Sequence, residues 1–319
     1  MQITKLLSRA LAAAGLALVA LAPAVAQAPF PSKQVTVVVA FPPGGGADLL
    51  GRLLAKKYSE AWGQTVVVIN RPGAAGLIGA KEVARAAPDG HTLLVGASGT
   101  VLTANEAELA PVSLLSTPPN IVAVNASLPV NNLREFVAYA KARTDGSVSF
   151  ASSGAGSSTH LAGELFQSLT QTRLTHIPYK GMGQAVLDLV GGQVTVMFGP
   201  PPALLPHIKS GKLKALAVAD SHRSPLFSEI PTSAEAGVPG LESRVWYGIF
   251  VPAGTPAAVI AKINADTSKA LAAPDVVETL ATQGATPAGG DPASFASFLK
   301  KDIATTEDLM RKAGLPLTQ

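Results

Sequence analysis

Two short segments of the chain combine glycines, small hydroxyl residues and the start of a helical pattern. The first, residues 41–48, reads FPPGGGAD, and the second, residues 151–160, reads ASSGAGSSTH. Glycines let main-chain N–H groups approach a ligand closely, and the first turn of a helix offers unpaired N–H groups and a dipole that favours anions. The chemistry that these segments predict is the binding of an anion by backbone amides and hydroxyls.

Neither segment matches a nucleotide-binding motif. A P-loop requires Gly-Lys-Ser/Thr after its spacer, whereas Ala47 and Asp48 follow the glycines of the first segment. The pattern G-x-G-x-x-G fails at Leu49 in the first segment and at Thr159 in the second. The anion is therefore not expected to be a nucleotide phosphate.

An ordinary strand-to-helix turn is the alternative interpretation of each segment. Asp48 would then cap the first helix, and Ser157 or Ser158 would cap the second. One such segment in each half of the chain favours a single anion site between two lobes. Because neither segment contains Arg or Lys, each helix start would hold a carboxylate through amides and hydroxyls. The pair predicts a small ligand with carboxylates at both ends.

His160 follows the second segment and could donate a hydrogen bond to a bound carboxylate. The alternative is a capped or partly buried histidine of the first helical turn. Ser157 and His160 are three residues apart, but no G-x-S-x-G elbow occurs in the chain and no acid is placed to orient the histidine. The five histidines also form no H-E-x-x-H pattern. A hydrolase and a metal site are therefore not expected, and no catalytic residue is assigned.

Other residues are expected to line the same cleft. Ser98 lies in a small-residue loop after a predicted strand, and Tyr179 precedes Lys180 at the end of another. Several aromatic residues stand at strand ends, where most belong to the core and one or two could form an apolar wall for the ligand: Phe41, Phe150, Phe198, Trp246 and Tyr247.

The elements that must position these residues form an α/β pattern. Continuous β-branched runs at 35–41, 65–69 and 92–95 alternate with helical spacing at 47–62 and 77–86, which is typical of a doubly wound domain. A second set then follows, with strands at 121–125, 148–151, 174–178, 194–198 and 213–219 and helices at 133–142, 160–169 and 183–190. A strand at 244–251 and helices from 256, at 274–283 and at 292–312 close the chain. We expect lobe 1 to comprise 27–125 and 225–319, and lobe 2 to comprise 126–224.

Composition sets the class of protein. The 319 residues are 47% hydrophobic and 14% charged, and they include no cysteine, so a disordered chain, a disulfide scaffold and a lipid-modified cysteine are excluded. Residues 1–26 have a basic start, a short apolar core and an A-x-A site, which predicts an export signal cleaved after Ala26. Without Lys5 and Arg9 the net charge falls from +4 to +2, and no basic cluster supports nucleic-acid binding.

Several motifs, taken in order, resemble those of the Bug-type periplasmic solute receptors of the tripartite tricarboxylate transporter family. They read FPPGGGAD at 41–48, NRPGAAG at 70–76, PDGHTLL at 88–94, SSG at 152–154 with HLAGE at 160–164, PYKG at 178–181, LVGGQV at 189–194 and PAGTP at 252–256. The resemblance covers nearly the whole chain after the signal. It implies the two-lobed α/β fold of type II periplasmic binding proteins, with a ligand cleft between the lobes and neither catalysis nor a cofactor.

The same resemblance assigns candidate site residues. They are Phe41, Gly44, Gly45, Gly46, Ala47, Asp48, Ser98, Ser153, Gly154, Ser157, Ser158, His160, Tyr179 and Phe198. The chain departs from the family in three places: Gly199 stands where an acid is usual, the stretch between 100 and 111 is short, and the last helix lacks a common tryptophan. The missing acid removes a partner for a ligand amine, which argues against an amino-acid ligand.

The expected function is capture of a small organic acid, a di- or tricarboxylate or an aromatic carboxylate, in the periplasm. A monomer is expected to deliver that acid to the membrane permease of a tripartite tricarboxylate transporter. Presentation of the bound acid to a membrane sensor kinase is the alternative.

Overall fold

The computed structural model describes residues 29–100 and 108–312. The chain divides into two compact units, Met1–Ser32 and Lys33–Gln319, and all described helices and strands belong to the second. The predicted signal, residues 1–26, and most of the short stretch between 100 and 111 lie outside the described residues. In the described ranges, no helix is both long and apolar enough to span a membrane.

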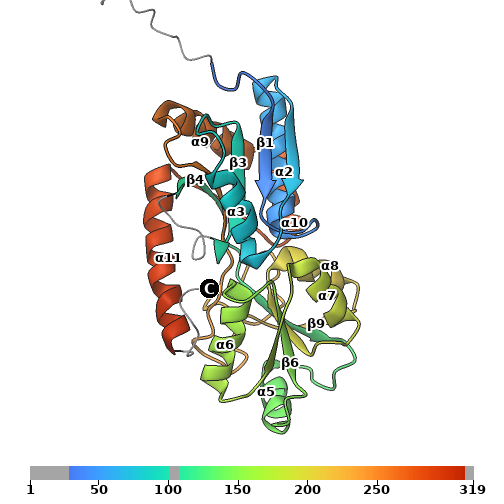
Figure 1. Ribbon diagram of the computed structural model, residues 1–319. Helices are drawn as coiled ribbons and strands as arrows, with labels where there is room; N and C mark the ends of the chain where they lie inside the picture. The colour runs from blue at the N-terminus through green and yellow to red at the C-terminus, as the bar shows by residue number, and fades with distance from the viewer. Residues whose placement is uncertain (1–28, 101–107, 313–319) are drawn as a thin grey trace, which may run out of the picture. The chain divides into compact units, whose positions relative to one another are not determined.

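The first sheet holds the parallel strands that the sequence predicts. β1 pairs in parallel with β2 and with β3, whereas β10 lies antiparallel between β3 and β4. The strand order is β11-β4-β10-β3-β1-β2, with bounds β1 Val35–Val39, β2 Val66–Asn70, β3 Thr92–Ala97, β4 Leu109–Ser116, β10 Tyr247–Pro252 and β11 Pro287–Gly289. Its helical elements are α2 Gly46–Trp62, η1 Ala74–Gly76, α3 Leu77–Ala84, α9 Ala257–Ala272, α10 Pro274–Thr282 and α11 Pro292–Lys312. In Figure 1 the helices α2, α3, α9 and α10 lie around this sheet in the upper half, and α11 extends from it into the lower half.

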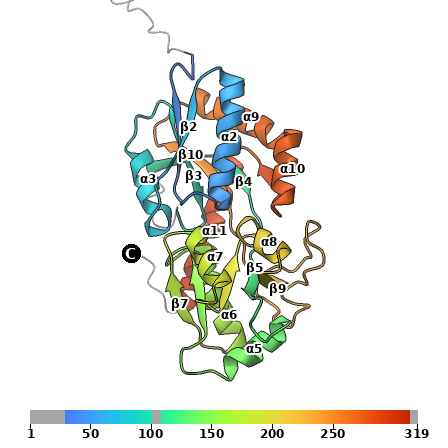
Figure 2. The same cartoon turned by 90° about the vertical axis from the view of Figure 1, so that its right-hand side faces the viewer.

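The second sheet also combines parallel and antiparallel pairs, with five strands in place of six. β6 pairs in parallel with β7 and β8, and β5 pairs antiparallel with β8 and β9. The order is β7-β6-β8-β5-β9, with bounds β5 Ile121–Asn125, β6 Ser149–Ser152, β7 Thr175–Pro178, β8 Val196–Gly199 and β9 Leu213–Val218. The helices are α5 Leu133–Lys141, α6 Ser158–Thr170, α7 Met182–Val190 and α8 Pro201–Lys209. The view in Figure 2 shows them around the second sheet.

The alternation of side chains along the strands builds a core on each face of the second sheet. Val122 and Val124 of β5 pack with Phe136 of α5 on one face, while Ile121 and Ala123 pack on the other. Successive residues of a strand point to opposite faces, so this separation follows from the sequence itself. The sheet is therefore buried on both sides, as its continuous apolar runs indicate.

Two segments that lie side by side join the sheets. The Asn120 N–H donates to the Ser243 carbonyl at 2.9 Å, and the Val245 N–H donates to the Pro118 carbonyl at 3.1 Å. Residues 117–120 thus lead from β4 to β5, and residues 243–246 lead back to β10. α11 packs against β4 of the first sheet and reaches α6 of the second (Figure 1).

The sheets divide the chain at other positions than 125 and 225. β5 lies in the second sheet, although the expected boundary placed it in lobe 1. Phe227 and Ile230 pack in the core of the second sheet as well, and so does Leu241. Hydrophobic periodicity shows that a segment is buried, but it does not show against which sheet. The divisions by sheet fall at 117–120 and 243–246.

Four elements lie outside the predicted pattern, among them the three-residue η1. β4 contains Pro111, and the proline weakens the strand signal because proline donates no ladder hydrogen bond. α8 begins with Pro201 and Pro202 and contains Pro206, so its sequence resembles a loop although proline is favourable in a first turn. β11 is only three residues long.

Candidate functional site

The first glycine loop ends at the start of α2 and leaves that start open. Gly45 is the N-cap residue, and it supplies no side-chain cap. The first N–H groups of a helix have no intrahelical partner, so those of Gly46 and Ala47 remain available at this end. The prediction that Asp48 caps α2 is wrong, because Asp48 is already inside the helix.

Asp48 instead stabilises the loop through hydrogen bonds to its carboxylate. Its carboxylate accepts hydrogen bonds from the Gly44 N–H at 3.1 Å, from Arg52 Nε at 3.0 Å and from Asn70 Nδ2 at 2.9 Å. Burial alone would raise the pKa of this carboxyl, but the bonds from Arg52, Asn70 and Gly44 together hold that pKa below its usual value. Asp48 therefore stays ionised and positions the glycines without facing the cleft.

The second glycine loop is capped in the ordinary way. Ser157 is the N-cap of α6, and its hydroxyl accepts a hydrogen bond from the His160 N–H and donates one to the Gly154 carbonyl at 2.7 Å. Thr159 Oγ1 accepts from the Ser153 N–H at 2.9 Å. The turn interpretation of this segment is thus confirmed for Ser157, and its hydroxyl is used within the loop.

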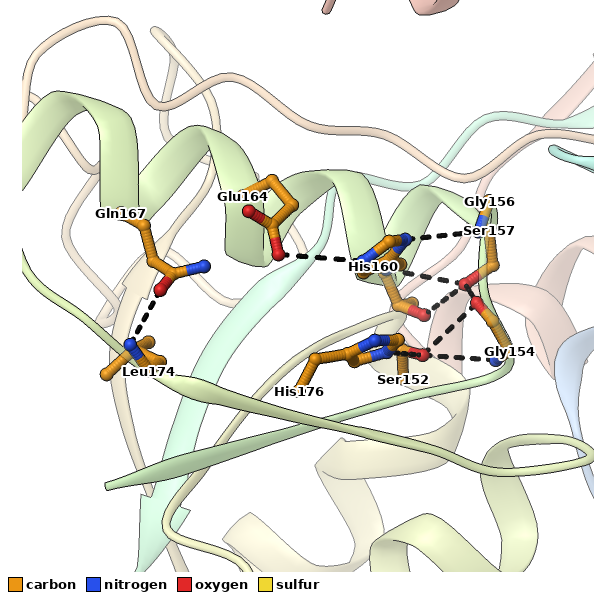
Figure 3. Close-up of polar contacts among 10 residues, drawn as sticks. Ser152, Gly154, Gly156, Ser157, His160, Glu164, Gln167, Leu174 and His176 are labelled. Atoms are coloured by element: carbon orange, nitrogen blue, oxygen red, sulfur yellow. Dashed lines mark hydrogen bonds and ion pairs between the residues drawn. The ribbon is translucent and has the colours of Figure 1, made fainter. Parts of the chain in front are cut away.

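Two stacked histidines are hydrogen-bonded to residues of the second loop. His160 Nδ1 accepts a hydrogen bond from the Gly156 N–H at 3.1 Å, and its ring stacks on that of His176 with centroids 3.9 Å apart. His176 Nε2 lies 2.7 Å from Ser152 Oγ, which in turn accepts from the Gly154 N–H at 3.1 Å (Figure 3). The pair forms a platform under the loop.

Burial governs the protonation of that platform. The buried position of His176, with a second contribution from the neighbouring His160, lowers the pKa of His176 to about 4. Glu164 opposes the shift only in part; its Oε1 lies 3.5 Å from His160 Nε2. His176 is therefore neutral near neutral pH.

A small cavity of about 40 Å³ lies where the two loops meet. Seven of the predicted site residues line it: Phe41, Gly45, Gly46, Ala47, Ser98, Ser153 and Ser158. The other lining residues are Pro42, Ala97, Thr159, Met182, Gly183, Pro200, Val245 and Tyr247. Within this lining, drawn from the described part of the chain, no side chain is charged, so an anion would be held by N–H groups, hydroxyls and the two helix dipoles.

The remaining predicted residues lie away from this lining: Gly44, Asp48, Gly154, Ser157, His160, Tyr179 and Phe198. Phe198 is fully buried in the core beside Phe150 and Phe166, because the alternation along β8 turns it toward α6. Tyr179 donates its hydroxyl to Asp188 Oδ2 at 2.6 Å, and burial together with Asp188 raises the pKa of Tyr179 to about 12.

Several lining residues were not among the predicted site residues. Met182 and Pro200 follow strands β7 and β8, where a loop position could have indicated them. Tyr247 was recognised only as an aromatic residue near a strand end. Its partner strand could not be read from the sequence, and that partner places it beside Ala97 at the end of β3.

A second, larger cavity of about 200 Å³ shares Ser98 and Ser158 with the first. It lies between α6, α11 and the returning crossing, and Arg244 and Asp302 contribute charged side chains to its wall. Burial raises the pKa of Asp302, and the hydrogen bond from Trp246 Nε1 offsets this only in part. Because the open start of α2 faces the smaller cavity, we take the smaller one as the candidate site.

Comparison with known proteins extends over nearly the whole chain. The model of the tripartite tricarboxylate transporter family receptor matches residues 50–315. Protein BugT of Bordetella pertussis is 38% identical over 299 residues, which cover 90% of this chain and 91% of BugT. The chain belongs to this receptor family.

Solved structures agree with that membership. The periplasmic binding protein BugD has a TM-score of 0.86 at 32% identity, over 91% of this chain and 100% of BugD. An R. palustris protein solved with adipate has a TM-score of 0.86 at 34% identity, over 91% and 100% of the two chains. MatC from Rhodopseudomonas palustris, solved with bound malate, has a TM-score of 0.82 at 36% identity, over 88% and 99%.

These matches confirm the predicted class of this receptor-family member. The fold is the two-lobed α/β fold of type II periplasmic binding proteins. The chain is a Bug-type solute-binding receptor and not an enzyme.

Proposed function

We propose that this receptor binds a small organic acid, a di- or tricarboxylate or an aromatic carboxylate, in the cavity between the starts of α2 and α6. The observation that carries the proposal is the lining itself: Gly46 and Ala47 come from one sheet's helix start, and Ser153 and Ser158 come from the other's. Unpaired N–H groups and hydroxyls without a neighbouring cation suit carboxylate oxygens better than they suit a metal ion. The adipate and malate bound to two relatives belong to the same ligand class.

Gly199 favours an acid without an amino group. A Cβ there would lie 2.8 Å from Met182 Cε and 3.1 Å from Leu204 Cδ1, so a larger residue at this buried end of β8 would have to displace the end of Met182. The resemblance to the family implies an acidic residue at this position, and this chain lacks it. The lining of the cavity, as far as the structure describes it, offers no carboxylate to a ligand amine.

We propose further that the two sheets are the cores of the two lobes and that the crossings at 117–120 and 243–246 separate them. A volume of about 40 Å³ accommodates only about three water molecules. A four- to six-carbon acid therefore enters only when the loops of the two sheets move apart.

Export and delivery complete the proposal. The signal at residues 1–26 would direct the chain to the periplasm, where the receptor passes its ligand to the permease of a tripartite tricarboxylate transporter. The family description supports a permease over the sensor kinase that the sequence left as the alternative. Uptake of labelled acid by vesicles that hold the permease should require added receptor.

Calorimetry on purified, ligand-stripped receptor tests the binding proposal. Titrations with malate, adipate, citrate and benzoate should give saturable heat for at least one acid, and glucose should give none. The melting temperature of the same samples should rise when that acid is added. A ligand at about 100 times its dissociation constant stabilises the folded protein by about 2.7 kcal/mol. A response restricted to sugars or metal ions would contradict the proposed ligand class.

A further inference from the structure

Tyr247 presents a buried hydroxyl to the candidate cavity. It is the first residue of β10, only 4% of its surface is exposed, and it lines the cavity. Across the described residues, no hydrogen bond joins its hydroxyl to the rest of the protein, and burial is the only cause of its raised pKa. The phenol is therefore protonated near neutral pH and free to donate.

The buried phenol of Tyr58 and the half-buried phenol of Tyr179 both have partners. Tyr58 Oη lies 2.5 Å from Thr267 Oγ1, and Tyr179 Oη donates to Asp188. Buried polar groups in folded proteins are nearly always hydrogen-bonded, because leaving one unpaired forfeits its interaction with water. The hydroxyl of Tyr247 has no such partner within the described residues, and it opens onto the cavity, where a ligand can supply one.

Its position fits a ligand held at the start of α2. A Cβ added to Gly46 would lie 2.4 Å from Tyr247 Oη and 2.7 Å from its Cζ, so the hydroxyl reaches the first residue of that helix. Gly46 has ordinary helical geometry and is not among the glycines with positive φ. Close approach of the phenol, and not backbone conformation, therefore requires glycine at this position.

We propose that Tyr247 is a specificity-determining residue whose hydroxyl donates to the carboxylate oxygen bound at the start of α2. This inference rests on the proposed function and adds a residue to it. A ligand oxygen there would pair both the open helix N–H groups and the phenol. A ligand with an apolar group at that point would leave all of them unpaired, and a site with buried polar groups rejects such ligands strongly.

The test compares Tyr247→Phe with a matched variant. Tyr58→Phe also removes one buried phenol hydroxyl, but in α2 against Thr267 and away from the cavity lining. Calorimetry with whichever of the four acids the wild-type protein binds best should show at least a tenfold loss of affinity for Y247F and less than a twofold change for Y58F. In the ligand-free protein the order should reverse, with Y58F lowering the melting temperature and Y247F leaving it unchanged or raised.

The possible outcomes distinguish the role of Tyr247 from the proposed receptor function. Wild-type affinity in Y247F would overturn the role of Tyr247 and leave the receptor proposal standing, whereas a wild-type protein that binds none of malate, adipate, citrate and benzoate would overturn both. If Y247F does not fold, Gly46→Ala gives the same test, because its Cβ must displace the phenol. Unchanged affinity in G46A would then overturn the inference.

Discussion

Asp48 shows how a charged residue can stabilise a glycine loop of the candidate site without lining the cavity. Its carboxylate holds the Gly44 N–H, Arg52 and Asn70, and only 7% of its side chain is exposed. The sequence placed Asp48 in this loop; the alternative that it caps α2 is wrong, and its assignment as a ligand-binding residue stays a prediction. A residue type and its position do not show which way a side chain turns, and Asn70, 22 residues away in the chain, decides that here.

Replacement of Asp48 by Asn should weaken both stability and binding. The amide offers one acceptor oxygen where the carboxylate offers two, so at least one of the three part-buried hydrogen bonds is lost, and the free energy of unfolding should fall by about 1 kcal/mol. Urea unfolding at neutral pH measures this loss, and calorimetry should show weaker acid binding because the glycine loop loses its anchor. Glu60→Gln on the same helix removes only an exposed contact to Lys57 and should change stability by less than about 0.5 kcal/mol. Equal losses in the two variants would refute the anchoring role.

At the scale of elements, periodicity predicted those whose patterns are strong. β1, α2 and β3 lie where continuous apolar runs and helical spacing indicated them. β4 and α8 were missed because tertiary pairing overrides their proline-rich sequences. Both glycine loops do meet at one cavity, but the strand partner that brings Tyr247 there is a long-range pairing, which local patterns do not encode.

The pair of histidines under the second glycine loop, His160 and His176, should make the stability of the folded protein depend on pH. His176 has a pKa of about 4 in the folded protein against 6.5 for the ordinary side chain, so the unfolded chain binds a proton that the folded chain refuses between these values. Stability is unaffected above pH 6.5 and falls progressively toward pH 4. Allowing for the partial exposure of His176, the loss should be roughly 1–2 kcal/mol.

Urea unfolding at pH 7, 6, 5 and 4 measures this slope. His176→Gln should flatten it, because the titrating ring is gone. His222→Gln, at an exposed position near Ser221, should keep the wild-type slope. If H176Q retained the full pH dependence, the ring pair would not be its source, and His160 and Glu164, which face His176, would be tested next.

At the scale of the whole molecule, low charge and abundant glycine fit the proposed way of binding an anion, which uses backbone N–H groups and hydroxyls in place of charged side chains. We have proposed that the two sheets are the cores of the lobes and that the crossings at 117–120 and 243–246 join them. The sequence predicted two lobes, but it could not assign β5 and the segment around Phe227 to a sheet, because both are apolar whichever sheet they join. The same architecture determines how ligand binding should affect unfolding.

An acid bridging both lobes should stabilise both of them. The two tryptophans, Trp62 and Trp246, pack with the first sheet's helices and strands, so fluorescence reports that side alone, while far-UV circular dichroism reports both sheets. With the acid that binds best in calorimetry at about 100 times its dissociation constant, the urea midpoints of both signals should rise together, by the equivalent of about 2.7 kcal/mol. Glucose at the same concentration should move neither midpoint. An acid held by the first lobe alone would shift the fluorescence midpoint and split the circular dichroism curve into two transitions, and that result would contradict a site shared between the starts of α2 and α6.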